Sequence, residues 1–238
     1  VMVGGSAGMA NNVTGAVYSA GLANVSTNSA SVRPHLVFVN RAVTYISPSF
    51  NGFRVELQTA NQELDPGTGA ANKISAKETG GSLKYAAGKF SAGYGVATSK
   101  LDAANTASDT KMAQEALNAT YDFGVAKVFA LHTNRKDTVN GGLIADTKNT
   151  ELGVQVPMGK TVLFASGYDG SRKGLSTTAL ADGNADTSGM QAGAMYNLSK
   201  RTTAYAIYGQ QEIKGTGVTD NDLKIKSKMT SVGVRHSF

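Results

Sequence analysis

Hydrophobic and polar residues alternate along most of this chain with a period of two. Between residues 52 and 61, Phe53 and Val55 lie on one face of an extended strand, and Arg54 and Glu56 lie on the other. A period of two is typical of strands that have one apolar face and one polar face. Helical periodicity is almost absent, so the pattern predicts an all-β protein.

Eleven segments show this alternation. Their length of about ten residues is what a strand needs to cross a membrane. The polar faces carry Arg, Lys, Glu, Gln, Asn, Ser and Gly, which suits a water-filled lumen. The expected strands are residues 37–47, 52–61, 80–87, 89–100, 111–122, 125–135, 148–156, 160–169, 188–198, 201–213 and 225–238.

The connections between these segments alternate between short and long. A transmembrane barrel has short turns at its periplasmic end and long loops at its external end, which explains the alternation. The pattern therefore predicts a transmembrane antiparallel β-barrel. The short connections are 48–52, 87–89, 123–125, 157–159 and 199–201, and the long ones are 62–79, 101–110, 136–147, 170–187 and 214–224.

Aromatic residues gather beside the short turns. A barrel in a membrane carries a girdle of aromatic side chains at the lipid–water boundary. We expect such a girdle from Tyr45, Tyr85, Tyr121 and Tyr196, which precede short turns, and from Phe53, Phe90 and Phe123, which follow them.

Composition narrows the possible functions. The 238 residues include 28 Gly and no Cys, which excludes disulfides and thiolate metal sites. The net charge is +6, but no basic cluster with stacking aromatics indicates a nucleic-acid partner. The three His residues stand in no recognisable arrangement with Ser or Asp, so we expect no enzyme, no cofactor and no metal site.

Four segments resemble one known family. The chain ends in SVGVRHSF, and YNLSKRT occupies 196–202, VNRAVTYISPSFNGF 39–53 and TYDFGVAK 120–127. Together these segments resemble the general porins of β-proteobacteria, which lie in the Gram-negative outer membrane. In such barrels the final aromatic residue, here Phe238, helps the barrel-assembly machinery recognise the chain.

The resemblance implies a sixteen-stranded antiparallel barrel that assembles as a homotrimer and has a third external loop folded into its lumen. The eleven strands would be the last eleven of sixteen, within residues 37–238, and residues 1–36 would be the tail of the constriction loop. Bacterial single-chain barrels have an even number of strands, and an open edge in lipid leaves backbone groups unsatisfied. An odd count of eleven means either that residues 1–36 hold a further strand or that this sequence lacks the first five strands. We favour the second interpretation, because residues 1–36 are rich in Gly, Ala, Ser and Asn and alternate poorly.

The function implied is diffusion of small hydrophilic solutes and ions through a water-filled channel, with a preference for anions. The alternatives are a substrate-specific channel for small anionic solutes and a non-conducting structural or adhesive barrel. A porin selects by width and by charges at mid-height of the lumen. The candidate pore-lining residues are Arg33, Arg41, Arg54, Glu56, Lys84 and Arg235.

Two details of these expectations depend on strand parity. Arg41 shares a face with Val43 and Tyr45, so it would sit at a bulge or face a subunit interface. Lys226 and Lys228 point outward near the external end, where they would either meet lipopolysaccharide phosphates or be solvated lysines at the end of a loop. The other partners expected are outer-membrane lipids and the permeating solutes.

Overall fold

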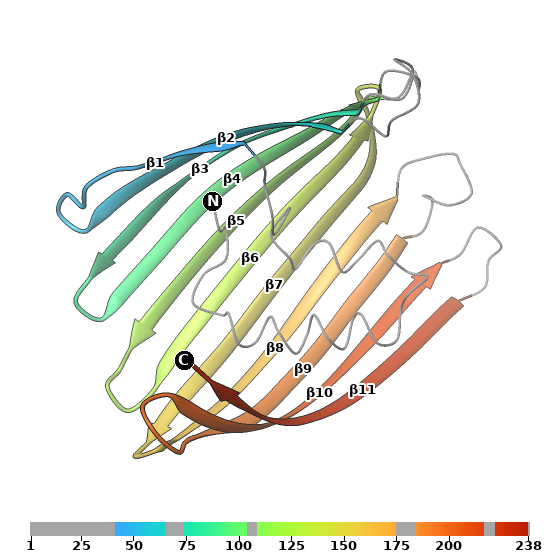
Figure 1. Ribbon diagram of the computed structural model, residues 1–238. Coiled ribbons are helices and arrows are strands. Elements are labelled where there is room, and N and C mark those ends of the chain that lie inside the picture. Colours follow the sequence, from blue (N-terminus) through green and yellow to red (C-terminus); the bar gives the residue numbers. More distant parts are fainter. Residues whose placement is uncertain (1–40, 65–73, 104–108, 175–183, 217–221, 238) are drawn as a thin grey trace.

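The computed structural model describes residues 41–64, 74–103, 109–174, 184–216 and 222–237 (Figure 1). The expected loop tail at residues 1–36, with Arg33, lies outside the described residues, as does Phe238. Within the described residues, no helix is long and apolar enough to cross a membrane.

Eleven strands form one antiparallel sheet in which each strand pairs with its neighbours in the sequence. Within the described residues, β1 pairs with β2 alone and β11 with β10 alone. The eleven expected strands are thus confirmed, although several are longer than predicted. The first, expected at 37–47, is Ala42–Ile46, and residues 37–40 lie outside the described residues. The strands are β1 (Ala42–Ile46), β2 (Phe53–Leu64), β3 (Ile74–Ala87), β4 (Phe90–Ala103), β5 (Thr110–Asp122), β6 (Lys127–Val139), β7 (Gly142–Met158), β8 (Thr161–Gly174), β9 (Asn184–Asn197), β10 (Thr202–Thr216) and β11 (Asp222–His236).

The expected long loop at 136–147 is wrong. β6 and β7 continue through most of that range and meet in a two-residue turn at Asn140 and Gly141. Both turn residues have positive φ, 49° and 78°, which is the geometry of a type I′ hairpin and the reason Asn-Gly is favoured there. The Asn-Gly pair is therefore a turn signal that outweighs the polar composition of its neighbours.

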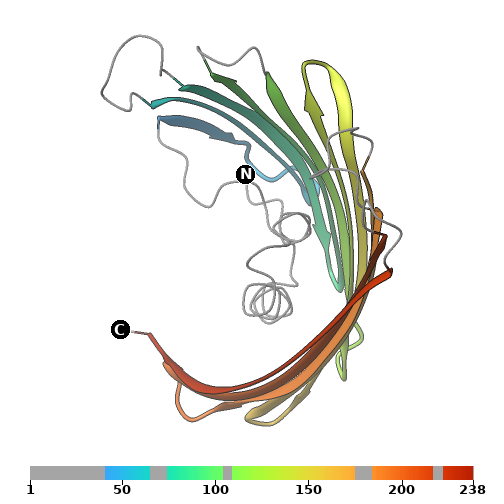
Figure 2. The same ribbon diagram turned by 90° about the vertical axis from the view of Figure 1, so that its right-hand side faces the viewer.

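The sheet curves strongly (Figure 2), and the side chains on its two faces differ in exposure. We call the concave face the inner face and the convex face the outer face. Side chains converge on the inner face and diverge on the outer face, so inner Glu56 and Gln191 are 6% and 3% exposed, whereas outer Val232 is 75% exposed. Apolar residues thus face outward, as the alternation predicted.

The inner face is less uniformly polar than expected. Phe164 and Ile207 are buried on it and contact Met195, Tyr205 and Met229. Phe164 lies across from Gly193, its register partner on β9. A Cβ atom at Gly193 would lie 2.6 Å from the Phe164 Cζ atom, so the absent side chain makes room for the ring. Part of the glycine excess is explained by such close packing.

The aromatic residues gather at the short-turn end of the sheet, as expected. Phe53 and Tyr85 are register partners with ring centroids 4.6 Å apart, and Tyr85 lies 6.2 Å from Phe90. Tyr121 and Phe123 form a further pair at 4.6 Å. All five are exposed or half-exposed beside short turns, which matches the geometry of a girdle. We call this end the turn end and the opposite end the loop end.

Candidate functional site

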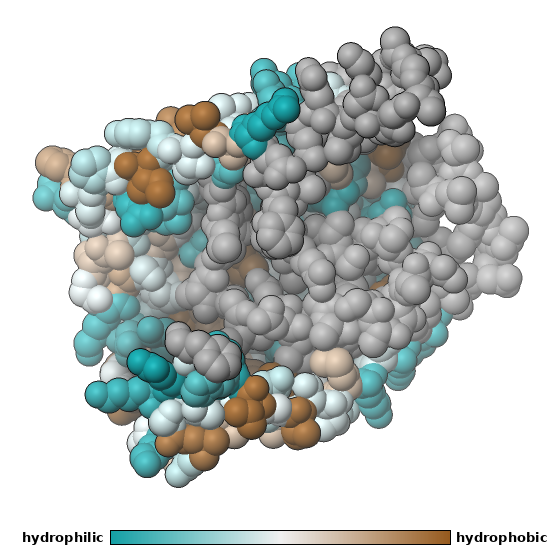
Figure 3. Space-filling model, in the orientation of Figure 1, coloured by the Kyte–Doolittle hydropathy of each residue, from teal (hydrophilic) through white to brown (hydrophobic). Residues whose placement is uncertain are grey.

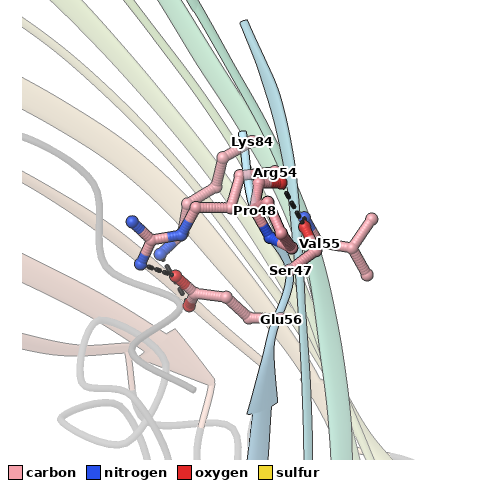
Figure 4. A network of polar contacts seen from close by, with 6 residues as sticks. All are labelled: Ser47, Pro48, Arg54, Val55, Glu56 and Lys84. Atoms are coloured by element: carbon pink, nitrogen blue, oxygen red, sulfur yellow. Dashed lines mark hydrogen bonds and ion pairs between the residues drawn. The ribbon is translucent and has the colours of Figure 1, made fainter. Parts of the chain in front are cut away.

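Three charged side chains form an ion-pair cluster on the inner face. Arg54 and Lys84 are register partners on β2 and β3, and Glu56 follows two residues after Arg54 on the same face. The Glu56 carboxylate accepts hydrogen bonds from Arg54 Nη2 at 2.6 Å and from Lys84 Nζ at 2.7 Å. Figure 4 shows the three side chains on one side of the ribbon and Val55 on the other. Parity correctly predicted that they share a face.

The burial of this cluster is uneven. The Glu56 side chain is 8% exposed, whereas those of Arg54 and Lys84 are 45% and 42% exposed. The carboxylate is thus covered by its two partners, and the cationic groups still reach open space. Because two cations share one anion, the cluster carries one net positive charge.

A tight turn determines where this cluster lies. Ser47 and Val55 close the turn between β1 and β2: the backbone N–H of Ser47 donates to the carbonyl oxygen of Val55, and the N–H of Val55 donates to Ser47 Oγ at 2.9 Å. Gly52, with φ of 85°, ends the turn. β2 begins at Phe53, so Arg54 lies at the turn end of the sheet and not at the expected mid-height.

A second charged cluster lies nearer the loop end of the inner face. Arg135 Nε donates to Asp137 Oδ1 at 2.7 Å, and both side chains are largely buried. Arg172, on β8, is 9% exposed on the same face. Sequence reasoning missed this cluster because residues 136–147 and 170–187 were expected to be loops. The Asn-Gly turn signal would have extended β6 far enough to place Asp137.

The remaining candidates lie apart from these clusters. Arg235 is on the inner face of β11, opposite Thr203. Arg41 lies just before β1 with φ of 54°, so the strand parity applied to it in the sequence does not hold. The strands of the described inner face carry six basic residues, Arg54, Lys84, Lys127, Arg135, Arg172 and Arg235, and five acidic residues, Glu56, Glu78, Asp122, Asp137 and Glu151.

The residues that the structure describes contain no group of three or more His, Asp or Glu side chains that could hold a metal ion. The inner face therefore offers fixed charges and hydrogen-bonding groups along the wall of a curved sheet.

A family model described as Gram-negative porin matches residues 1–216. The chain belongs to the Gram-negative porin family. It is an outer-membrane protein, and its family consists of channel proteins that are not enzymes. The resemblance carried by the four sequence segments and the expected absence of enzymatic function are thereby confirmed.

Relatives of this porin include proteins of β-proteobacteria. It is 29% identical to Outer membrane porin protein 32 of Delftia acidovorans, over 84% of this chain and 56% of the relative. The solved anion-selective porin from Comamonas acidovorans is 25% identical, with a TM-score of 0.67 over 84% of this chain and 60% of that one. The trimer form of OmpT from Vibrio cholerae shares the fold, with 16% identity and a TM-score of 0.60 over 82% of this chain and 64% of that one. The porin chain thus spans less than two thirds of the relatives it matches.

Proposed function

We propose that this porin contributes to a water-filled diffusion channel for small hydrophilic solutes and ions, with a weak preference for anions. The eleven strands would be part of a sixteen-stranded barrel that assembles as a homotrimer. Residues 1–36 would form the tail of the constriction loop. The proposal is supported by the curved sheet with a charged inner face and by similarity to a porin described as anion-selective.

The observation that carries the anion preference is the charge balance of the inner face. Its six basic and five acidic residues leave one net positive charge, and the Arg54–Glu56–Lys84 cluster has the same surplus. An anion would approach the half-exposed Arg54 and Lys84 groups, while Glu56 neutralises one of them. A surplus of one charge favours a weak selectivity, since fixed charges in a hydrated channel are screened by salt.

Arg235 would add to the positive potential at the turn end, and Arg33 and Arg41 would do so where the constriction loop meets the wall. The cluster of Arg135, Asp137 and Arg172 would line the wall nearer the loop end. The net charge of +6 for the whole chain does not bear on this preference, because most of the lysines lie on the outer face.

The test is planar-bilayer conductance of the full-length protein in a salt gradient. We expect an ohmic channel whose reversal potential shows modest anion preference. A cation-selective reversal potential would refute the anion preference. A channel that saturates with one small anionic solute would favour the substrate-specific alternative, and a folded protein that does not conduct would favour the structural barrel.

A further inference from the structure

A small group of polar side chains interrupts the apolar outer face of the sheet on β4, β5 and β6. Glu115, on β5, accepts a hydrogen bond from Tyr94 Oη on β4 at 3.0 Å and one from Asn134 Nδ2 on β6 at 2.9 Å. His132, on β6, shares a hydrogen bond of 2.9 Å with Thr150 Oγ1 on β7 through its Nδ1 atom. Register pairing from the outward residues of β2 places all five side chains on the outer face. We call Tyr94, Glu115, His132 and Asn134 the outer polar cluster.

The outer polar cluster lies near the middle of the membrane. Glu115 is seven residues before Asp122, where β5 ends, and His132 is five residues after Lys127, where β6 begins. Strands that rise about 3.3 Å per residue and tilt by about 40° gain roughly 2.5 Å of height per residue. The two side chains are therefore roughly 12–18 Å above the turn end, inside an apolar band that is about 25 Å tall.

The other strands are apolar at this depth. On β2, β3 and β7–β11, the outward positions four to seven residues from the turn end hold only Gly, Ala, Val, Leu, Met, Thr and Tyr. Figure 3 shows hydrophobic residues on β11 toward its turn end and hydrophilic residues near its loop end. Ionisable side chains inside a membrane are rare, and nearly all of them pair with one another or face a protein interior. The location of Glu115 and His132 therefore indicates a protein partner.

Three groups of the cluster are not satisfied by the residues that the structure describes. Glu115 forms no ion pair with them, and only neutral donors contact its carboxylate. His132 is exposed and bonds through Nδ1 to β7, away from Glu115, so that its Nε2 atom has no partner in the described strands. Asn134 Oδ1 is buried and likewise accepts no hydrogen bond from them. Lipid tails offer neither donors nor acceptors. A partner that completes the cluster must bring a donor to Glu115 and an acceptor to His132.

A second copy of this chain brings both groups. A two-fold axis along the membrane normal keeps every residue at its own depth, and Glu115 and His132 differ by only about 5 Å in depth. An axis between β5 and β6 brings His132 of the second copy to Glu115 of the first, and Glu115 of the second copy to His132 of the first. The surface is thus complementary in charge to itself.

The surface beside the cluster allows two copies to approach closely. Ala92, Ala119 and Ala130 are register partners in one row on the outer face of β4, β5 and β6. Small side chains at contacts within membranes let backbones approach, and packing and hydrogen bonds then stabilise the contact. Leu117, the register partner of His132, is 54% exposed between this row and Glu115. It supplies an apolar side chain at the centre of the surface.

We propose that the outer face of β4–β6 is a contact between two membrane-embedded copies of this porin, in which His132 of each copy donates a hydrogen bond to Glu115 of the other. A trimer with three-fold symmetry uses two different surfaces of each subunit, whereas a self-complementary surface forms pairs. The contact is therefore separate from the three-fold contacts of the proposed trimer and joins two such assemblies side by side. It goes beyond the diffusion channel proposed above and depends only on the membrane location.

The test is cysteine cross-linking in outer membranes, since the 238 residues contain no Cys. The full-length protein carries L117C as its single cysteine, with any cysteine elsewhere in the chain replaced by Ser. Oxidation should link two copies, and the unheated sample should show a covalent product of twice the mass of the uncross-linked assembly. The matched control is V232C, because Val232 is 75% exposed on the outer face of β11 at a similar depth. It should give little product.

Variants on the L117C background test the pairing of the two side chains. E115Q and H132Q should each lower the initial rate of cross-linking by at least about tenfold, because truncating one partner of a buried, hydrogen-bonded charge pair is costly. The double variant E115H/H132E exchanges the two groups and should restore the rate. All variants should keep the heat-resistant electrophoretic mobility of a folded barrel, which separates loss of the contact from loss of folding.

Equal rates in L117C and V232C would overturn the proposal, because random collisions would then explain both. A covalent product no larger than the uncross-linked assembly would also overturn it and would assign the surface to a contact within the trimer. A product that contains a different protein would assign the surface to that protein instead. Unchanged rates in E115Q and H132Q would show that the two side chains do not hold the copies together.

Discussion

The charge cluster at the turn end of the inner face predicts opposite changes of ion selectivity in two variants. Glu56 holds both Arg54 and Lys84, so the cluster carries one net positive charge. The variant E56Q removes the anion and leaves two positive charges. The variant R54Q leaves Lys84 paired with Glu56 and no net charge. Anion preference should therefore rise in E56Q and fall in R54Q.

The size of the effect follows from Coulomb's law. An ion that passes about 6 Å from a unit charge in water feels about 0.7 kcal/mol, and screening by ~0.1 M salt reduces this to about 0.4 kcal/mol. The energy has opposite signs for anion and cation, so one charge changes their local ratio by about fourfold. Because the cluster lies at one end of the wall, we expect a change of about twofold in the anion-to-cation permeability ratio.

The assay is the reversal potential of single channels of the full-length protein in a tenfold salt gradient. The control is E115Q, since Glu115 is an outer-face carboxylate that accepts hydrogen bonds from Tyr94 and Asn134. Its removal makes the same chemical change on the other side of the wall and should leave selectivity unchanged. The reasoning fails if E56Q and R54Q shift selectivity in the same direction, or if E115Q shifts it as much as they do.

Three further predictions concern stability, each measured by urea unfolding of the protein in lipid vesicles. Replacing Gly193 by Ala places a methyl group 2.6 Å from the Phe164 ring and from the carbonyl oxygen of Ala206, which should lower the free energy of unfolding by about 1–3 kcal/mol. The control is Gly167→Ala, whose methyl group meets only an ordinary contact at 3.6 Å. An equal loss of stability in the control would contradict the packing argument. Replacing Gly141 by Ala places a Cβ atom at φ of 78° and should cost roughly 1–2 kcal/mol, a loss that would be absent if the turn were not type I′. Replacing Tyr85 by Ala removes its ring contact with Phe53 and should cost about 0.5–1.5 kcal/mol, so an unchanged midpoint would show that the pair does not stabilise the sheet.

The faces of the strands could be predicted from the sequence because side-chain direction in a strand depends only on parity. Phe53 and Val55 point outward, and Arg54 and Glu56 point inward, with no knowledge of the neighbouring strands required. Parity failed at Arg41, which precedes β1 in a left-handed conformation. Parity gives the direction of a side chain only where the backbone is extended. At the ends of strands the local sequence does not show where the extended backbone begins.

The missed cluster at the loop end has a related cause. Polar residues between 136 and 147 suggested a loop, yet Asp137 lies in a strand beside Arg135. In a water-soluble protein a polar run usually marks a connection, but the loop-end half of a barrel strand is polar on both faces. The composition of that half therefore resembles a loop, and only pairing with the neighbouring strand shows that it continues.

The sequence by itself determined the number of strands, their alternating faces, the short turns and the aromatic residues beside them. Each of these follows from the spacing of residues along the chain, because apolar side chains face the lipid and polar side chains face the water. The tertiary structure decided which side chains meet: Arg54 and Lys84 are 30 residues apart in the chain and become neighbours through the register of β2 and β3. It also placed the described strand arginines on the inner face and most of the exposed strand lysines on the outer face. The net charge of +6 therefore describes mainly the outer surface, because register and curvature, which depend on the whole sheet, decide which charges share a wall.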